Sequence, residues 1–209
     1  MRRRSRNGAV GLCATLVMLL LLPGAAAGAP PRVPQSEAEW ASMSAAEKTA
    51  TMAYLESRLQ TRLADGTAQV RQVSKSVTVT TPASESSAGR SVASAAAVSV
   101  TYNCMVQWVT FPGEGDWVRG GGWTDASDYI DRIYASNLSQ QGQFLRDGQL
   151  KANWYQDLYG AAHAESWTGY QWAFFWEYVH WTTKGWHGAY DNGSWLLGPN
   201  TPCTVDVWL

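Results

Sequence analysis

The chain has 209 residues, of which 45% are hydrophobic and 12% aromatic, and its formal net charge at pH 7 is −1. Residues 100–209 alone hold five basic and eleven acidic residues. Because binding to nucleic-acid phosphates or to an anionic membrane surface depends on lysine and arginine, this composition argues against both kinds of partner.

The first 27 residues have the three parts of a secretory signal peptide. A start that contains four arginines precedes an apolar run over residues 9–22, and small residues follow at 25–29. The apolar run is shorter than the roughly 20 residues that a membrane-spanning helix needs. We therefore predict that residues 1–27 are removed, that the mature protein is secreted, and that it keeps no stable membrane anchor.

Residues 28–66 are predicted to be a helical N-terminal segment. Ser36 with Glu39 and Ser44 with Glu47 each have the spacing of a capping box. Apolar residues then recur at three- and four-residue steps, at Met52, Leu55, Leu59 and Leu63. The apolar stripe is narrow, which indicates a helix that docks on another domain, a pro-region, or a marginal surface helix.

Residues 67–97 have the composition of a flexible linker. Serine, threonine, alanine and valine dominate there, and large side chains are missing. Such a segment buries too little apolar area to order itself. The valines at its start, Val70, Val73, Val77 and Val79, leave a short strand there as an alternative.

From residue 98 onward the hydrophobic period is mostly two, which is typical of strands. Two turn sequences predict hairpins: Asp147-Gly148, and Asp191-Asn192-Gly193. Residues 111–116 and the glycines at 120–122 are expected to break strands. We count seven to nine short strands over residues 98–209, which predicts a mainly β fold, an antiparallel β-sandwich or alternatively a small barrel.

Two cysteines remain after the predicted removal of the leader, which contains Cys13. Cys104 lies on the first strand of the β domain and Cys203 on the last, each among residues that alternate inward. In an oxidising compartment such a pair predicts one disulfide. Metal binding by two isolated cysteines without nearby histidines is disfavoured, so we expect no metal and no cofactor.

Residues 118–146 combine a glycine-rich approach, residues 120–123, with the segment Tyr129-Ile130-Asp131-Arg132-Ile133-Tyr134 and with Leu138 before a turn. This combination resembles small secreted bacterial β-sandwich domains of unknown function. Such domains commonly have a cysteine near the glycines, where this chain has Thr124-Asp125. The resemblance implies a β-sandwich and secretion, and it brings no catalytic residues.

Eleven of the twelve tryptophans follow Cys104, which is more indole area than a core of this size readily encloses. The densest run, residues 170–181, alternates as one strand with bulky residues on both faces. It is therefore either a central strand covered on both sides or a strand with an exposed aromatic face. The second alternative predicts a ligand-binding surface that includes Trp172, Trp176 and Tyr178, with Trp154 and Trp186 as additions.

Two acid-bearing patterns could carry other chemistry. His163 and Glu165 share a strand face, where an imidazole beside a carboxylate can do acid–base work. Asp125, Asp128 and Asp131 offer oxygen ligands of the kind that calcium prefers. The first pattern is also that of an ordinary exposed strand pair. The second is also that of solvated acids at a turn.

The sequence therefore favours a secreted, non-catalytic binding module whose ligand is a glycan or a protein partner. It contains no Gly-x-Ser-x-Gly, His-Glu-x-x-His or phosphate-loop motif. One alternative is a secreted hydrolase that uses carboxylates such as Glu114, Glu165 or Glu177. Another is a bacteriocin-like effector whose N-terminal segment is a removable pro-region.

Overall fold

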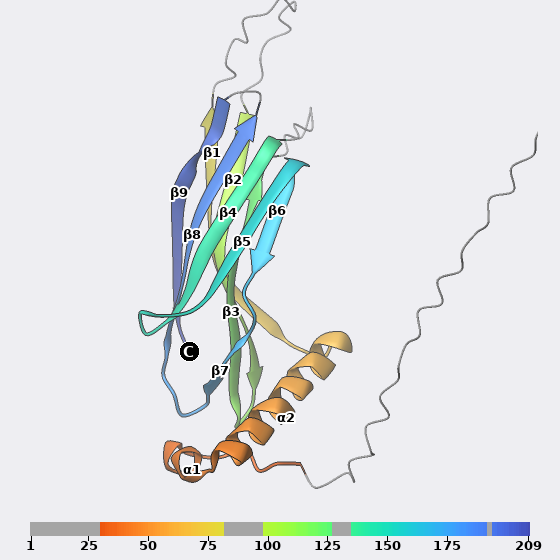
Figure 1. Cartoon of the computed structure of the whole chain (residues 1–209), viewed down its shortest axis with the longest axis vertical. Helices are drawn as coiled ribbons and strands as arrows, with labels where there is room; N and C mark the ends of the chain where they lie inside the picture. The colour runs from red at the N-terminus through yellow and green to blue at the C-terminus, as the bar shows by residue number, and fades with distance from the viewer. Residues whose placement is uncertain (1–29, 82–97, 127–134, 192–193) are drawn as a thin grey trace, which may run out of the picture. The chain divides into compact units, whose positions relative to one another are not determined.

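The computed structural model describes residues 30–81, 98–126, 135–191 and 194–209. Within these ranges the chain forms two helices followed by nine strands (Figure 1). The helices are α1 (Glu37–Ser42) and α2 (Ala45–Ala64). The strands are β1 (Val70–Thr81), β2 (Val98–Phe111), β3 (Gly115–Asp125), β4 (Ala135–Arg146), β5 (Gln149–Ala161), β6 (His163–Trp167), β7 (Gln171–Phe174), β8 (His180–Asp191) and β9 (Ser194–Trp208). No described helix is both long enough and apolar enough to cross a membrane.

The strands pair antiparallel in two sheets. One has the order β1-β2-β3-β6, with β7 also paired to β3, and the other has the order β5-β4-β8-β9. Buried side chains of both sheets, such as Val106 on β2 and Phe144 on β4, belong to one hydrophobic cluster. The predicted antiparallel sandwich is confirmed, and the described strands close no barrel.

The predicted disulfide joins the two sheets. Cys104 on β2 and Cys203 on β9 are bonded, with their Cα atoms 5.9 Å apart. Both side chains are buried, as the alternation along each strand predicts. The bond therefore links a central strand of one sheet to an edge strand of the other.

Both predicted hairpins are present. Arg146 pairs with Gln149 across Asp147-Gly148, where both turn residues have positive φ (49° and 75°). That backbone matches the twist of the strands, and Asp-Gly adopts it readily. The second hairpin pairs Asp191 with Ser194, and its two turn residues lie outside the described ranges.

The glycines at 120–122 do not break a strand, so that prediction was wrong. All three lie inside β3 and pair with β2. A methyl group built on Gly120 would stand 2.5 Å from the ring of Phe144, and one on Gly121 would stand 2.5 Å from the ring of Trp167. The glycines therefore leave room for large rings that pack against β3.

Residues 170–181 are not one strand, which corrects a second prediction. β7 ends at Phe174, and β8 begins at His180 in the other sheet. The N–H of Glu177 donates to the carbonyl of Phe174 at 2.9 Å, and the Glu177 carboxylate accepts both the Phe174 N–H (2.7 Å) and Arg146 (2.5 Å). This turn, held by an arginine from β4, carries the chain from one sheet to the other.

The predicted helical region consists of two docked helices. Ser44 and Glu47 form the full capping box, which starts α2 directly after α1. On α2, Leu55 and Leu59 are each 1% exposed and pack in a cluster with Phe111 and Trp117. Arg58 also pairs with Glu114, which lies between β2 and β3. The helix is therefore a docked part of the structure; its removal as a pro-region stays a prediction.

The predicted linker is ordered over much of its first half. Residues 70–81 form β1 and pair with β2 along its whole length, from Val70 with Val109 to Thr81 with Val98. The valines that suggested a short strand thus belong to a twelve-residue edge strand. Residues 82–97 of the predicted linker, the predicted signal peptide, and residues 129–134 of the resemblance lie outside the described ranges.

Candidate ligand-binding face

The outer face of the β5-β4-β8-β9 sheet has a strip of uncharged polar side chains along its β4 strand. Leu138, Gln140 and Phe144 on β4 are at most 1% exposed. Because side chains alternate along a strand, the residues between them point away from the core. This polar strip consists of Asn137, Ser139, Gln141 and Gln143.

Aromatic residues flank the polar strip at two levels, each level defined by strand register. In the first rung, Gln141 stands opposite Tyr155 on β5 and Trp186 on β8. In the second rung, Asn137 stands opposite Tyr159 on β5 and Tyr190 on β8.

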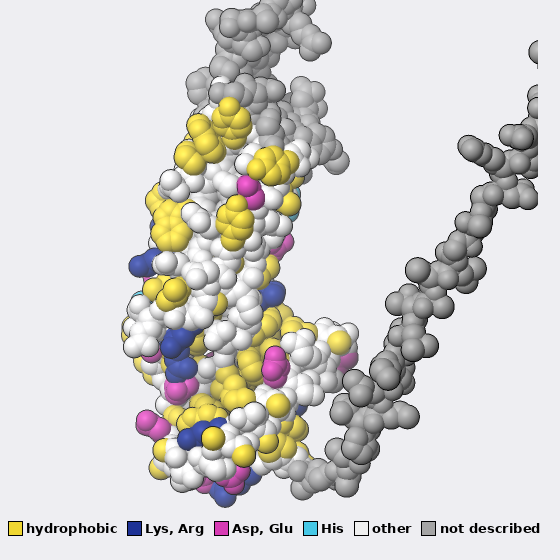
Figure 2. Space-filling model, viewed as in Figure 1, with side chains coloured by type: hydrophobic (Ala, Val, Ile, Leu, Met, Phe, Trp, Pro, Cys, Tyr) yellow, Lys and Arg dark blue, Asp and Glu magenta, His cyan; other side chains and the backbone are white. Residues whose placement is uncertain are grey.

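The rings of both rungs are accessible to a ligand. Tyr155 is 66% exposed and Tyr159 76% exposed, while Trp186 and Tyr190 are half-buried. Trp195, 49% exposed, extends the second rung with its ring 5.1 Å from that of Tyr190. Figure 2 shows this face, where hydrophobic side chains form separate groups in a surface that is otherwise mostly uncharged.

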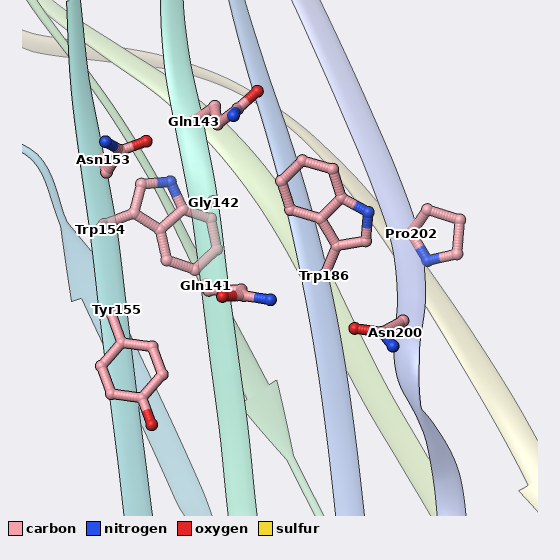
Figure 3. A pocket seen from close by; sticks show the side chains of 9 residues that line it. All are labelled: Gln141, Gly142, Gln143, Asn153, Trp154, Tyr155, Trp186, Asn200 and Pro202. Atoms are coloured by element: carbon pink, nitrogen blue, oxygen red, sulfur yellow. The ribbon is translucent and has the colours of Figure 1, made fainter.

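The first rung borders a groove of about 650 Å³ (Figure 3). This volume is within the range of small-molecule sites. The residues that line the groove are Gln141, Gly142, Gln143, Asn153, Trp154, Tyr155, Trp186, Asn200 and Pro202. None of them is charged, and the four amides can each donate and accept hydrogen bonds.

Gly142 makes room for the ring of Trp154 beneath the groove. A methyl group built on Gly142 would stand 2.3 Å from the indole of Trp154, so only glycine fits beside that ring. Trp154 itself is 4% exposed and reaches into the interior, where its ring lies 5.9 Å from that of His187. Trp154 therefore supports the floor of the groove, whereas Trp186 and Tyr155 form its accessible sides.

Among the described residues, Asp157 places a charge between the two rungs and Lys184 places one beyond the first rung. Asp157 lies opposite Ser139. Its negative charge is the main reason that the pKa of Tyr155 is raised. Lys184 lies opposite Gln143, at the end away from the second rung. An anionic ligand along the polar strip would meet Asp157 at its middle, so the face disfavours an anionic ligand.

The five predicted ligand-binding residues do not form one surface. Trp172, 8% exposed, packs with Trp176 in the cluster under α2. Tyr178 is 76% exposed and stacks on Trp208 near the C-terminus. Of the five, only Trp154 and Trp186 line the groove. The rings of Trp172 and Trp154 are buried and leave little area for a ligand.

Sequence reasoning missed the residues that accompany Trp186 on the outer face. The signal was present after the Asp147-Gly148 turn, where Ala152, Trp154, Gln156 and Leu158 follow one another at every second position and so share one strand face. The intervening residues had to point the other way. These are Asn153, Tyr155, Asp157 and Tyr159.

The carboxylates proposed for a hydrolase each have a structural partner. Glu114 pairs with Arg58, and Glu177 pairs with Arg146. Glu165 accepts a hydrogen bond from the indole of Trp167 at 2.7 Å. These contacts give the three carboxylates roles in holding the fold.

His163 lies between two acids on the surface. Its ring nitrogens are 3.9 Å from an Asp125 oxygen and 3.8 Å from a Glu165 oxygen. The side chain is 49% exposed, which suits an ordinary surface pair. The other two aspartates of the calcium pattern, Asp128 and Asp131, lie outside the described residues.

A buried histidine lies beside the disulfide. His187 is fully buried, with Nδ1 2.8 Å from the Thr124 hydroxyl and Nε2 3.2 Å from the sulfur of Cys203. Cys104, Cys203 and His187 have the geometry of three metal ligands. Zinc binds thiolates, however, and both sulfurs are used in the disulfide, so this arrangement serves the core.

Burial lowers the pKa of His187 to about 4, from an ordinary value of 6.5. Between those two pH values the unfolded chain binds a proton on this residue that the folded chain does not. We expect His187 to contribute a loss of about 3 kcal/mol in unfolding free energy as the pH falls from 7 to 4. Urea unfolding at both pH values checks this. His187→Gln should lose that part of the pH dependence, and equal dependence in both proteins would contradict the prediction.

Comparison with known proteins provides no relative for this chain. No protein-family model matches it, and neither a curated protein nor a solved structure does. The resemblance of residues 118–146 to secreted bacterial domains therefore stays a prediction.

Proposed function

We propose that this protein is a secreted, non-catalytic module that binds a neutral glycan on the outer face of the β5-β4-β8-β9 sheet. The observation that carries the proposal is the first rung, where the amide of Gln141 lies between the rings of Tyr155 and Trp186. Secretion is part of the proposal and rests on the basic and apolar start of the chain.

The chemistry of a sugar ring matches that rung. A pyranose has a face of C–H bonds and a rim of hydroxyl groups. Tyrosine and tryptophan offer flat apolar area together with a polar edge, so they can stack on the C–H face. The amides of Gln141, Gln143, Asn153 and Asn200 can donate to and accept from hydroxyls.

The exposure of the aromatic residues supports a binding role over a structural one. Tyr155 and Tyr159 are both more than half exposed, whereas the core of the sandwich is filled by other residues such as Trp181 and Phe144. Exposed apolar area grouped on one face commonly marks an interaction site. The lack of charge in the groove favours a glycan over a charged protein partner or a polyanion.

Binding to insoluble polysaccharides tests the proposal. The exported protein is mixed with neutral cellulose and chitin, and with polygalacturonate as an anionic control, and the bound fraction is measured. We expect retention on at least one neutral polymer and none on polygalacturonate. Failure to bind any neutral polymer would overturn the glycan proposal, and retention on the polyanion alone would replace it by charge-driven binding.

Trp186→Ala is expected to weaken binding to the retained polymer by at least about tenfold, an effect of about 1.4 kcal/mol. Because Trp186 is half-buried on the sheet surface, the unfolding free energy of the variant should differ from that of the wild type by only about 1 kcal/mol. A binding isotherm and a urea titration measure both quantities. Phe175→Ala, which removes a 46% exposed ring outside this face, is the matched control. Unchanged binding by Trp186→Ala would remove the first rung from the site.

A further inference from the structure

We infer that the ligand is an extended, uncharged polysaccharide chain that lies along β4 and contacts both rungs at once. The inference rests on the proposed function and adds the form of the ligand and its direction. It starts from the second rung, which the groove around Trp186 does not include.

The two rungs repeat one arrangement along the strands. Tyr155 and Tyr159 are four residues apart on β5, and so are Trp186 and Tyr190 on β8. At a rise of about 3.3 Å per residue the rungs are about 13 Å apart. Each rung has an amide side chain from β4 at its centre, Gln141 in the first and Asn137 in the second.

The residues between the rungs bound the path of a chain that runs from one rung to the other. Ser139 is opposite Gly188 on one side and Asp157 on the other. The side chain of Ser139 is small, but Gly188 is covered from β9, because a methyl group built on it would stand 3.0 Å from the Cα atom of Pro199. The ring of Trp195 would lie 3.3 Å from a methyl group on Gly188, so it borders the strip there. A continuous ligand would therefore pass over Ser139, with Asp157 on one side and Trp195 and Pro199 on the other.

A ligand that crossed the strands would use the first rung alone. That row runs from Tyr155 through Gln141 and Trp186 to Pro202. It would leave Tyr159 and Trp195, 76% and 49% exposed, without a role. Lying along β4 gives a role to both rungs, and the uncharged polar strip supplies hydrogen bonds over the whole distance.

Chain-length dependence of binding tests this direction. Calorimetric titrations compare the disaccharide and the hexasaccharide of cellulose and of chitin on the full exported protein. We expect the hexasaccharide of the retained polymer to bind at least about tenfold more tightly than its disaccharide. Tyr159→Ala should remove that gain, whereas Trp186→Ala should weaken every oligosaccharide that binds.

The outcomes separate this inference from the proposed function. If both lengths bind equally and both need Trp186, the glycan site stands and the extended chain is wrong. If Tyr159→Ala leaves hexasaccharide binding unchanged, the ligand crosses the strands. Tyr159→Phe keeps the ring and should restore the hexasaccharide gain. Urea unfolding of Tyr159→Ala confirms that a lost gain reflects ligand contact, because this exposed residue should leave stability within about 1 kcal/mol.

Discussion

Replacement of Cys104 and Cys203 together by alanine is expected to lower the free energy of unfolding by about 4–5 kcal/mol. The disulfide closes a loop with a sequence separation of 99 residues. In the chain-entropy account, a bond across so long a loop removes much of the freedom of the unfolded chain. Urea unfolding of the variant and the wild type, both at pH 7, measures the difference.

The wild-type protein with its disulfide reduced is the matched control for that variant. Both cysteines are buried, at 0% and 6% exposed, and the reduced protein keeps the sulfurs that alanine removes. The sulfur of Cys203 lies 3.2 Å from Nε2 of His187, so the alanine variant leaves that nitrogen without this partner and should unfold at a urea concentration no higher than that of the reduced protein. A loss below about 1 kcal/mol in both would mean that the packed core alone holds the two sheets together.

Trp172→Ala is expected to lower the free energy of unfolding by about 3–5 kcal/mol, the usual cost of removing a buried tryptophan. Trp172 is 8% exposed, and its ring lies 4.8 Å from Trp117 and 5.9 Å from Phe174. The cluster also receives Leu55 and Leu59 from α2. The variant should thus loosen the contact between α2 and the sheet, which urea unfolding and limited proteolysis of α2 both measure.

This prediction separates a core role for Trp172 from the ligand-binding role that the sequence suggested. Phe175→Ala removes a ring three residues further along that is 46% exposed, and it should cost at most about 1 kcal/mol. A Trp172→Ala protein of normal stability that had lost glycan binding would return this ring to the binding surface.

Local sequence determined the parts of the fold that depend on neighbouring residues. The capping box of Ser44 and Glu47 starts α2 because its hydrogen bonds join residues three apart. Asp147-Gly148 makes a hairpin because these residues accept positive φ. Alternation along β2 and β9 turned Cys104 and Cys203 inward, so the disulfide was predictable from the two strands and from the predicted export.

Only the tertiary structure decided where strands ended and which rings were covered. Residues 170–181 alternate like one strand, but Glu177 bonds to Arg146 from another strand and turns the chain. The glycines at 120–122 look like a break in the strand, but the rings of Phe144 and Trp167 pack against Gly120 and Gly121, where a methyl group would not fit. Long-range contacts of this kind leave no local periodic signal.

The candidate site shows the same division. Sequence alternation sufficed to put Tyr155 and Tyr159 on one face of β5, opposite Trp154. Which face of β5 is exposed to solvent depended on the second sheet, which covers Trp154. The burial of Trp172 on β7 depended in the same way on α2, which packs against it. The register of β4 with β5 and β8 then placed Gln141 between Tyr155 and Trp186. Composition determined that the chain has more indole rings than it hides easily, and sheet packing decided which of them remain accessible.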